Sequence, residues 1–254
     1  MIRIADLPVE WGNGYPDFVK DFVADSDCDP VMKIDFQSRL PECHGVKYTD
    51  GTADRFLCSD NGGFLFANKD WSQATSYLLP EFNTDFALPL AAICSRISYY
   101  NALLTHSSFV IYQGKGIIFT GYSGVGKTTQ AELWQKYKGA EIVNGDKVFI
   151  REIDSRFYAY GLPWKGSSEY CLNRKAELCG VVVLRQSEKN RITRLDEKSA
   201  ECFMPHIFLP HWDKECLGNA LDTFDKLIGN VPVYLLECRP DEEAVEVTKT
   251  AVFG

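Results

Sequence analysis

The strongest constraint on the fold of this chain is the stretch GYSGVGKT, residues 121–128, which matches G-x-x-x-x-G-K-[ST] in full. The apolar GKGIIFT before it predicts a strand, and KTTQAELWQKY after it has the pattern of a helix. Glycines at such a junction let successive N–H groups turn toward one anion, and the helix N-terminus adds its dipole. The match and both flanks predict a phosphate-binding loop and disfavour a plain glycine turn with an exposed lysine.

Two side chains of this loop have expected roles of their own. Lys127 is expected to reach the terminal phosphates of a nucleotide, and Thr128 to place its hydroxyl on Mg²⁺. The residues expected to contact the nucleotide are Gly121, Ser123, Gly124, Val125, Gly126, Lys127, Thr128 and Thr129.

A carboxylate follows the loop at a distance that suits the same site. Asp146 lies eighteen residues beyond Thr128, in EIVNGDKVFI, where an apolar strand ends beside a glycine. Such an aspartate can hold Mg²⁺ opposite the loop or accept a proton from an attacking hydroxyl. The alternative is that Asn144-Gly145-Asp146 forms only a hairpin turn, since Asn-Gly is a strong turn signal. Both interpretations can hold together.

Composition excludes several classes of protein. The net charge of -8 and the absence of a basic block argue against a nucleic-acid partner. Nine cysteines occur at irregular spacing and never as Cys-x-x-Cys, which favours free thiols over disulfides or zinc. No run of roughly 18 apolar residues and no signal-type start is present, so we expect a soluble, cytoplasmic protein with no membrane partner.

The order of the patterns predicts an α/β protein in two parts. Residues 1–85 are expected to form a smaller β-rich N-terminal part, and residues 86–254 a core in which strands alternate with helices. Within the core, the chain is expected to fold back between two strands at residues 113–116. Further helices are expected at residues 88–106, 197–209, 215–228 and after Pro240.

From residue 100 onward the chain resembles a known family. HSSFVIYQGKGIIFTGYSGVGKTTQAELW is similar to the phosphoenolpyruvate carboxykinase-like P-loop family, and within it to HPr serine kinase/phosphorylase and its shorter relatives. Later blocks that resemble these relatives are NGDKVFI, YGLPWKGSSEYCLN, LCGVVVLRQSEKNRITRL and VPVYLLECRPDEEAVE. The resemblance implies a phosphoenolpyruvate carboxykinase-like P-loop core, a mixed sheet with flanking helices.

The resemblance also implies roles for single residues. HPr kinases carry a histidine ahead of the loop, and His106 stands fifteen residues before Gly121, either as a catalyst or as a packed histidine. The family has two adjacent aspartates where this chain has Gly145 and Asp146. Asp146 alone then serves both metal and proton transfer, or the base is another group, with His106, Glu141 and Glu169 as candidates.

For several other residues, the sequence allows both a functional and a purely structural interpretation. Residues 160–166 form either a substrate-facing loop or a plain turn that places Trp164 in the core. Lone cations can meet phosphate oxygens, although most remain solvated; the candidates are Lys147, Arg151, Arg185 and Arg239. His206 and His211 have a spacing that does not suit a metal site on one helix.

These observations lead to an expected activity with alternatives. We expect an enzyme that uses ATP and Mg²⁺ to move the γ-phosphoryl group to a hydroxyl, most simply serine of a small protein or peptide, as the resemblance implies. Its catalytic residues would be Asp146, His106 and Lys127, and its metal ligands Thr128 and Asp146. The alternatives are a nucleotide-binding regulator without transfer activity and a small-molecule kinase or carboxykinase. The acceptor, and ATP against GTP or pyrophosphate, remain open, and the resemblance implies self-association.

Overall fold

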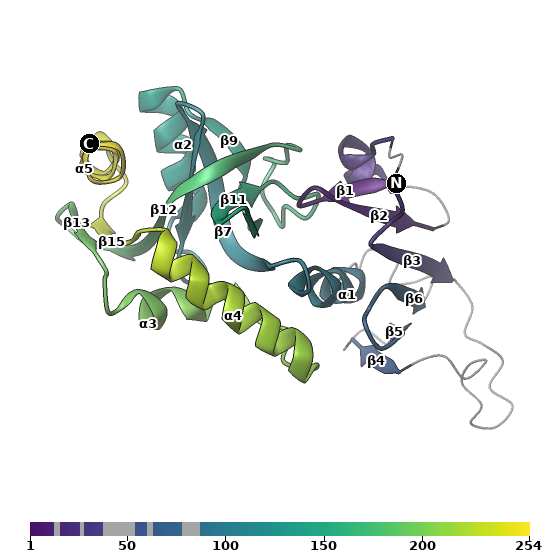
Figure 1. The fold of residues 1–254 in the computed structure, drawn as a ribbon. Coiled ribbons are helices and arrows are strands. Elements are labelled where there is room, and N and C mark those ends of the chain that lie inside the picture. Colours follow the sequence, from purple (N-terminus) through teal and green to yellow (C-terminus); the bar gives the residue numbers. More distant parts are fainter. Residues whose placement is uncertain (13–15, 26–27, 38–53, 60–62, 78–86) are drawn as a thin grey trace, which may run out of the picture.

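The computed structural model describes residues 1–12, 16–25, 28–37, 54–59, 63–77 and 87–254. These residues form two β-sheets, one from the N-terminal part of the chain and one from the rest, with the two chain ends at opposite ends of the molecule (Figure 1). The result is a mixed α/β protein in which helices flank a large mixed sheet. This coarse class agrees with the expectation from the sequence.

The first sheet has six short strands in the order β1-β2-β3-β6-β5-β4. The strands pair antiparallel except along β3, which runs parallel to both of its neighbours. One short 3-10 helix, η1 (Asp17–Phe22), packs beside β1. The strands are β1 (Ile2–Ile4), β2 (Leu7–Trp11), β3 (Met32–Gln37), β4 (Arg55–Cys58), β5 (Phe64–Ala67) and β6 (Gln73–Tyr77).

The second sheet follows the order β11-β10-β7-β8-β12-β15-β13, with β9 and β14 pairing along β7. Strands β8, β12 and β15 run parallel at its centre. An additional pairing of β11 with the start of β12 closes β11, β10, β7, β8 and β12 into a ring. The strands are β7 (Ala102–Tyr112), β8 (Lys115–Thr120), β9 (Glu141–Asn144), β10 (Lys147–Ile153), β11 (Arg156–Tyr160), β12 (Lys175–Gln186), β13 (Arg191–Arg194), β14 (Ile207–Phe208) and β15 (Val233–Cys238).

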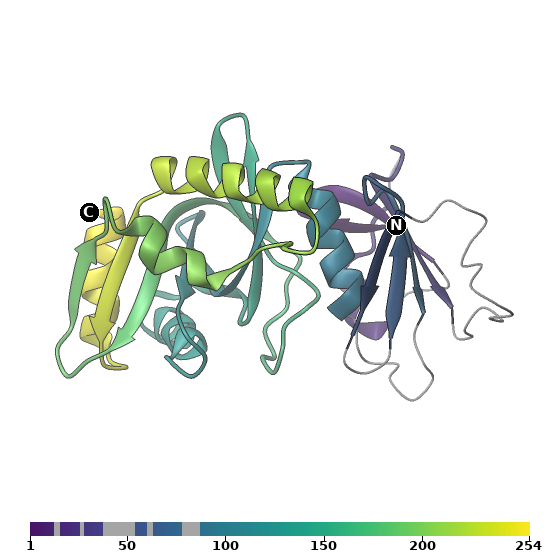
Figure 2. The same ribbon diagram turned by 90° about the horizontal axis from the view of Figure 1, so that it is seen from below.

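Helices cover both faces of the second sheet because its central strands are apolar on both sides. Along β12, Val181 and Val183 belong to one hydrophobic cluster, and Val182 and Leu184 to another, as the alternation of side chains in a strand requires. One face packs against α2 (Lys127–Lys138) and α5 (Glu242–Phe253). The opposite face packs against α3 (Ser199–Phe203), η3 (Met204–His206) and α4 (Lys214–Asn230), which is the long helix of Figure 2.

Helix α1 (Ala87–Ser98) lies between the two sheets in both views (Figures 1 and 2). Its apolar residues belong to the same hydrophobic cluster as the first sheet. A second link is the ion pair of Arg55 on β4 with Asp213 at the start of α4, at 2.6 Å. The division of the chain into residues 1–85 and 86–254 stays a prediction, and α1 packs across it.

Several expected elements have different bounds in the structure. The helix predicted over residues 88–106 ends at Ser98, and residues 102–106 belong to β7, where strand pairing decides the conformation of an apolar segment that suits both. The helix predicted over residues 197–209 breaks into α3, η3 and β14, with Pro205 in the break. The reversal at residues 113–116 is confirmed, since β7 and β8 form a hairpin there. The helices predicted at residues 215–228 and after Pro240 are also confirmed, as α4 and α5.

Two broader expectations are tested in the same residues. None of the helices that the structure describes combines the length and hydrophobicity that a membrane span needs. Each described cysteine has a free thiol, as its irregular spacing predicted.

Candidate phosphate-binding site

The predicted phosphate loop connects β8 to α2, with open space over two of its glycines. Gly124 and Gly126 have φ angles of 76° and 110°, which residues with a side chain rarely adopt. A Cβ atom added to either glycine would meet no atom within 4 Å, so the space over the loop is open. The backbone conformation therefore requires the glycines, and the space beside them is open to a ligand.

Several backbone N–H groups of the loop have no backbone partner. Among the described residues, the N–H groups of Gly124, Gly126, Lys127 and Thr128 donate to no backbone carbonyl, and α2 has no side-chain N-cap. Unpaired N–H groups at a helix N-terminus, together with the helix dipole, make a site for an anion.

Lys127 is the buried cation of the loop. Its Nζ donates to the carbonyl oxygens of Gly121 at 3.1 Å and Tyr122 at 3.2 Å, and the residue is 7% exposed. Burial lowers the pKa of Lys127, and the charge of Asp146 opposes that shift. The lysine thus lies folded against the loop, where an arriving phosphate can replace the two carbonyl contacts.

Asp146 lies in the short break between β9 and β10, which follow one another along the same edge of β7. Both β9 and β10 pair antiparallel with β7, and they do not pair with each other, so the hairpin alternative for residues 144–146 is wrong. Gly145 and Asp146 form the break, which is held by the N–H of Ser107 donating to the Asp146 carbonyl at 3.0 Å. The buried Asn144 also accepts from the N–H groups of Asp146 at 2.9 Å and Lys147 at 3.0 Å.

The carboxylate of Asp146 meets two of the groups that the sequence singled out. Its Oδ1 lies 3.4 Å from Nδ1 of His106, and its Oδ2 pairs with Nζ of Lys147. On the loop side, the Thr128 hydroxyl donates to the Gly145 carbonyl at 3.2 Å. Asp146, His106 and Thr128 therefore come together around the N-terminus of α2.

Two histidines lie near the Lys127 ammonium, and sequence reasoning found only one of them. Burial and the charge of Lys127 lower the pKa of His106, while Asp146 raises it and Lys147 lowers it further. Burial, Lys127 and His106 likewise lower the pKa of His206, which is 7% exposed. Both rings are then neutral near pH 7. His206 belongs to η3, far from the loop in sequence, and no local pattern marks it.

The segment expected to face substrate also lies here, at residues 160–166. A Cβ atom added to Gly166 would come within 2.6 Å of Oδ2 of Asp146, so the segment crosses directly over the carboxylate. Trp164 packs instead against Trp11 and Phe18, with ring centroids 6.3 Å and 5.8 Å away. The packing of Trp164 fits the interpretation as a turn with an inward tryptophan, and contact of the segment with substrate stays a prediction.

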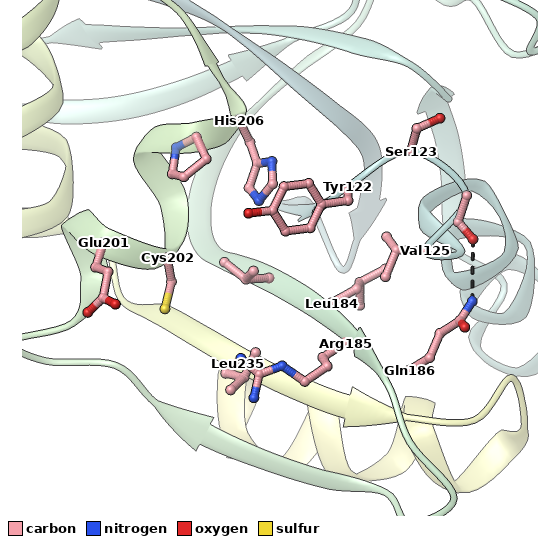
Figure 3. Close-up of a pocket in the computed structure, with 13 residues that line it drawn as sticks. Tyr122, Ser123, Val125, Leu184, Arg185, Gln186, Glu201, Cys202, His206 and Leu235 are labelled. Atoms are coloured by element: carbon pink, nitrogen blue, oxygen red, sulfur yellow. Dashed lines mark hydrogen bonds between the residues drawn. The ribbon is translucent and has the colours of Figure 1, made fainter.

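A pocket of about 560 Å³ adjoins the loop (Figure 3). Its walls are Tyr122–Val125 of the loop, the end of β12 at Val183–Gln186, and residues of α3 and η3. The Tyr122 ring is 74% exposed and meets His206 edge-on at 5.2 Å, and the Gln186 amide donates to the Gly124 carbonyl at 3.3 Å. The volume lies in the range of small-molecule sites.

Other candidates lie away from Asp146 or have different partners. Glu141 pairs with Arg174 at 3.4 Å at the opposite end of β9, and Glu169 is exposed. Arg151 donates to the carbonyls of Ala5 and Tyr100. Arg239 pairs with Asp241 and Glu243, while Arg185 lines the pocket. His211 contacts Trp212, and Ser123 and Thr129 are exposed.

Metal ligands are few in the residues that the structure describes. They contain no group of three or more histidine, cysteine, aspartate or glutamate side chains placed to hold a metal ion. A Mg²⁺ ion held mainly by phosphate and water needs only one or two protein oxygens. Thr128 and Asp146, on either side of the Gly145 carbonyl, each carry a side-chain oxygen of this kind.

Of the comparisons with known proteins, only the one with solved structures gives a likeness, and it is weak. No family model matches the chain, and no curated protein matches it. Among solved structures, the HPr(Ser) kinase/phosphatase from Coxiella burnetii is similar with a TM-score of 0.37 and 10% sequence identity, over 58% of this chain and 95% of that one. At this level of likeness, any conclusion on activity depends on the residues of the site itself.

Proposed function

We propose that the protein is a phosphotransferase that uses ATP and Mg²⁺ and moves the γ-phosphoryl group to a hydroxyl. The observation that carries the proposal is that a complete phosphate loop, with its buried lysine, faces an aspartate paired with a histidine. The resemblance of residues 100–254 to HPr kinases favours serine of a small protein or peptide as the acceptor.

The loop fits the phosphates of a nucleotide. Unpaired N–H groups and the Lys127 ammonium favour a multiply charged anion, and the space over Gly124 and Gly126 is open. His106, Lys127 and Lys147 surround the single carboxylate of Asp146, so positive groups outnumber negative ones when His106 is protonated, and still do when it is neutral.

Thr128 and Asp146 would hold Mg²⁺ through a hydroxyl and a carboxylate oxygen. When bound, the ion neutralises charge that develops on the phosphate oxygens during transfer. Asp146 has its carboxylate between Lys147 and His106, so metal binding would require it to release one of these contacts.

Asp146 and His106 are the groups proposed to orient the acceptor hydroxyl. A hydroxyl nucleophile in phosphoryl transfer needs mostly positioning, so one carboxylate serves where relatives have two. The lowered pKa of His106 keeps its ring neutral near pH 7, and a neutral imidazole can accept a proton.

The pocket beside Tyr122–Val125 is proposed to take the nucleoside. It begins at the loop, its lining residues do not include Asp146, and it offers an exposed aromatic residue with polar groups from Gln186 and Arg185. The terminal phosphate would then lie toward Asp146 and the base toward Tyr122. Exposed aromatic rings stack readily on planar bases.

A nucleotide-binding regulator without transfer activity is the second candidate. The observation that favours it is Gly145, which leaves the site with one carboxylate where the related kinases have two. A regulator would use the same loop, so it differs from the kinase only in turnover.

The test is incubation of the purified protein with γ-labelled ATP and Mg²⁺, alone and with serine-containing peptides and HPr. The proposal predicts label on an acceptor hydroxyl together with ADP release, both lost in Lys127→Ala and Asp146→Asn. Tight ATP binding with neither transfer nor ADP release would support the regulator instead.

A further inference from the structure

The space above Gly145 is occupied by the side chain of Ser168. A Cβ atom added to Gly145 would lie 2.1 Å from Oγ and 2.6 Å from Cβ of Ser168, closer than real atoms approach. Gly145 is not among the residues with positive φ, so the backbone conformation does not demand glycine. Steric exclusion by Ser168 is the reason that a side chain, including the second aspartate of the related kinases, does not fit at position 145.

Ser168 lies in the segment that crosses the candidate site. Its N–H donates to the Lys165 carbonyl at 3.0 Å, which closes a turn that holds Gly166 against the Asp146 carboxylate. The same Cβ position on Gly145 would lie 3.7 Å from Cγ2 of Thr128. Ser168 and Thr128 therefore flank Gly145, beside Asp146.

The Ser168 hydroxyl has hydrogen-bonding capacity to spare. Its oxygen accepts from the N–H of Tyr170 at 3.2 Å, and its proton has no acceptor among the described residues. The side chain is only partly buried, so this proton is available to a ligand at the site.

We propose that Ser168 takes over the place, and part of the role, of the missing carboxylate by donating a hydrogen bond to an oxygen of the terminal phosphate. The inference rests on the proposed function. A hydroxyl carries no charge and cannot act as a base at neutral pH, so Ser168 positions the phosphate while proton transfer stays with Asp146 and His106. Exchange of a carboxylate for a hydroxyl also removes a negative charge that would repel the phosphate.

A double-mutant cycle tests the geometry without any nucleotide. Gly145→Ala is expected to lower the urea midpoint of unfolding in the natural background, because its Cβ meets Ser168. In the Ser168→Gly background the same change is expected to cost little, since only the Thr128 contact at ordinary distance remains. Gly218→Ala, in open space on α4, is the control and should behave alike in both backgrounds. Equal losses from Gly145→Ala in both backgrounds would overturn the steric account.

Binding of ATP and ADP tests the role in phosphate recognition. Ser168→Ala is expected to weaken ATP binding about tenfold and leave ADP binding unchanged, because it removes one hydrogen bond to a charged oxygen. Ser168→Thr should retain ATP binding, and Ser167→Ala, at the exposed neighbour, should change neither. Unchanged ATP binding in Ser168→Ala, or an equal loss for both nucleotides, would overturn the inference.

Lys127→Ala separates this inference from the proposed function. If ATP binding does not depend on Lys127, the proposed function fails. If it depends on Lys127 and not on Ser168, only the role of Ser168 fails.

Discussion

The two sheets of the molecule differ in the length of their strands and in how far their two faces are buried. Strands β7 and β12 of the second sheet have 11 and 12 residues and are buried on both faces, whereas strands of the first sheet have at most 6. One face of the first sheet packs into a core, and the other carries an aromatic group made of Phe56, Phe64, Phe66 and Tyr77. Every group of the candidate phosphate site comes from the second sheet and its connections.

The first sheet reaches this site only indirectly. Trp11 and Phe18 pack on Trp164, which precedes the residues that cross over Asp146. The second sheet thus carries the proposed chemistry, and the first supports one segment of the candidate site.

The largest expected effect is on transfer. Asp146→Asn is expected to lower the rate of phosphoryl transfer at least about 100-fold, because it removes the charge proposed to hold metal and to orient the acceptor. The urea midpoint of unfolding should stay close to that of the natural protein, so the loss of rate does not come from unfolding. Glu177→Gln, which removes a carboxylate paired with Lys115 at the opposite end of β8, is the control and should retain activity. Full transfer by Asp146→Asn would contradict the assignment of chemistry to this site.

A large effect on stability is expected from the first sheet. Trp11 is 5% exposed, so Trp11→Ala should lower the free energy of unfolding by about 3 kcal/mol in urea titrations. Transfer by the folded fraction should fall too, because Trp164 loses its packing partner. Phe56→Ala, at an aromatic residue that is 57% exposed on the same sheet, should change neither quantity. A destabilised Trp11→Ala protein with full activity would separate the two sheets functionally.

The contact of Asp213 with Trp71 and Arg55 predicts that the stability of the fold depends on pH in the acid range. Burial alone would raise the pKa of Asp213, but hydrogen bonds from Trp71 and the Cys216 N–H, together with Arg55, lower it to about 2. A carboxylate with a depressed pKa stabilises the fold above its ordinary value of 3.8, and this stability is lost as pH falls toward 2.

Asp213→Asn should accordingly lose about 2 kcal/mol of stability at pH 7 and show a flatter decline between pH 4 and 2. Denaturant titrations at a series of pH values measure both slopes. Asp196→Asn, at an exposed residue paired with Arg194, should keep the natural slope. Parallel curves for the natural protein and Asp213→Asn would disprove the linkage.

The smallest expected effect concerns His206. A histidine whose pKa is lowered in the folded state binds fewer protons there than in the unfolded chain, so stability falls as pH drops below about 6.5 toward that lowered pKa. His206→Gln should decline less over this range, measured by unfolding at pH 7 and pH 5. His211→Gln, at an exposed ring, should follow the natural curve. An unchanged slope in His206→Gln would place its ring outside the buried site.

Part of the candidate site follows from local patterns in the sequence. Lys127 and Thr128 follow from one continuous motif, and Asp146 from a strand that ends in a carboxylate near the loop. His106 was named through a family resemblance, and the structure places it 3.4 Å from that carboxylate. His106 lies on the long strand β7, Lys127 and Thr128 begin helix α2, and Asp146 lies in the break between β9 and β10.

The rest depends on contacts between distant segments. His206 reaches the loop because a chain broken at Pro205 pairs briefly with β7, and Ser168 because its segment crosses Gly145. Neither event has a local signature. The order of the first sheet was not predictable either, since strands of three to six residues carry too little alternation to specify their partners.

The most direct test of the account is the affinity of the protein for ATP in the presence of Mg²⁺, measured by calorimetry for the natural chain, Lys127→Ala and Lys115→Ala. Lys115 lies at the opposite end of β8 and pairs with Glu177, so it controls for loss of a positive charge. The account predicts that the natural chain and Lys115→Ala bind ATP alike, and that Lys127→Ala binds it at least about tenfold more weakly. Equal binding by all three proteins, or no binding by the natural chain, would contradict a nucleotide site at this loop.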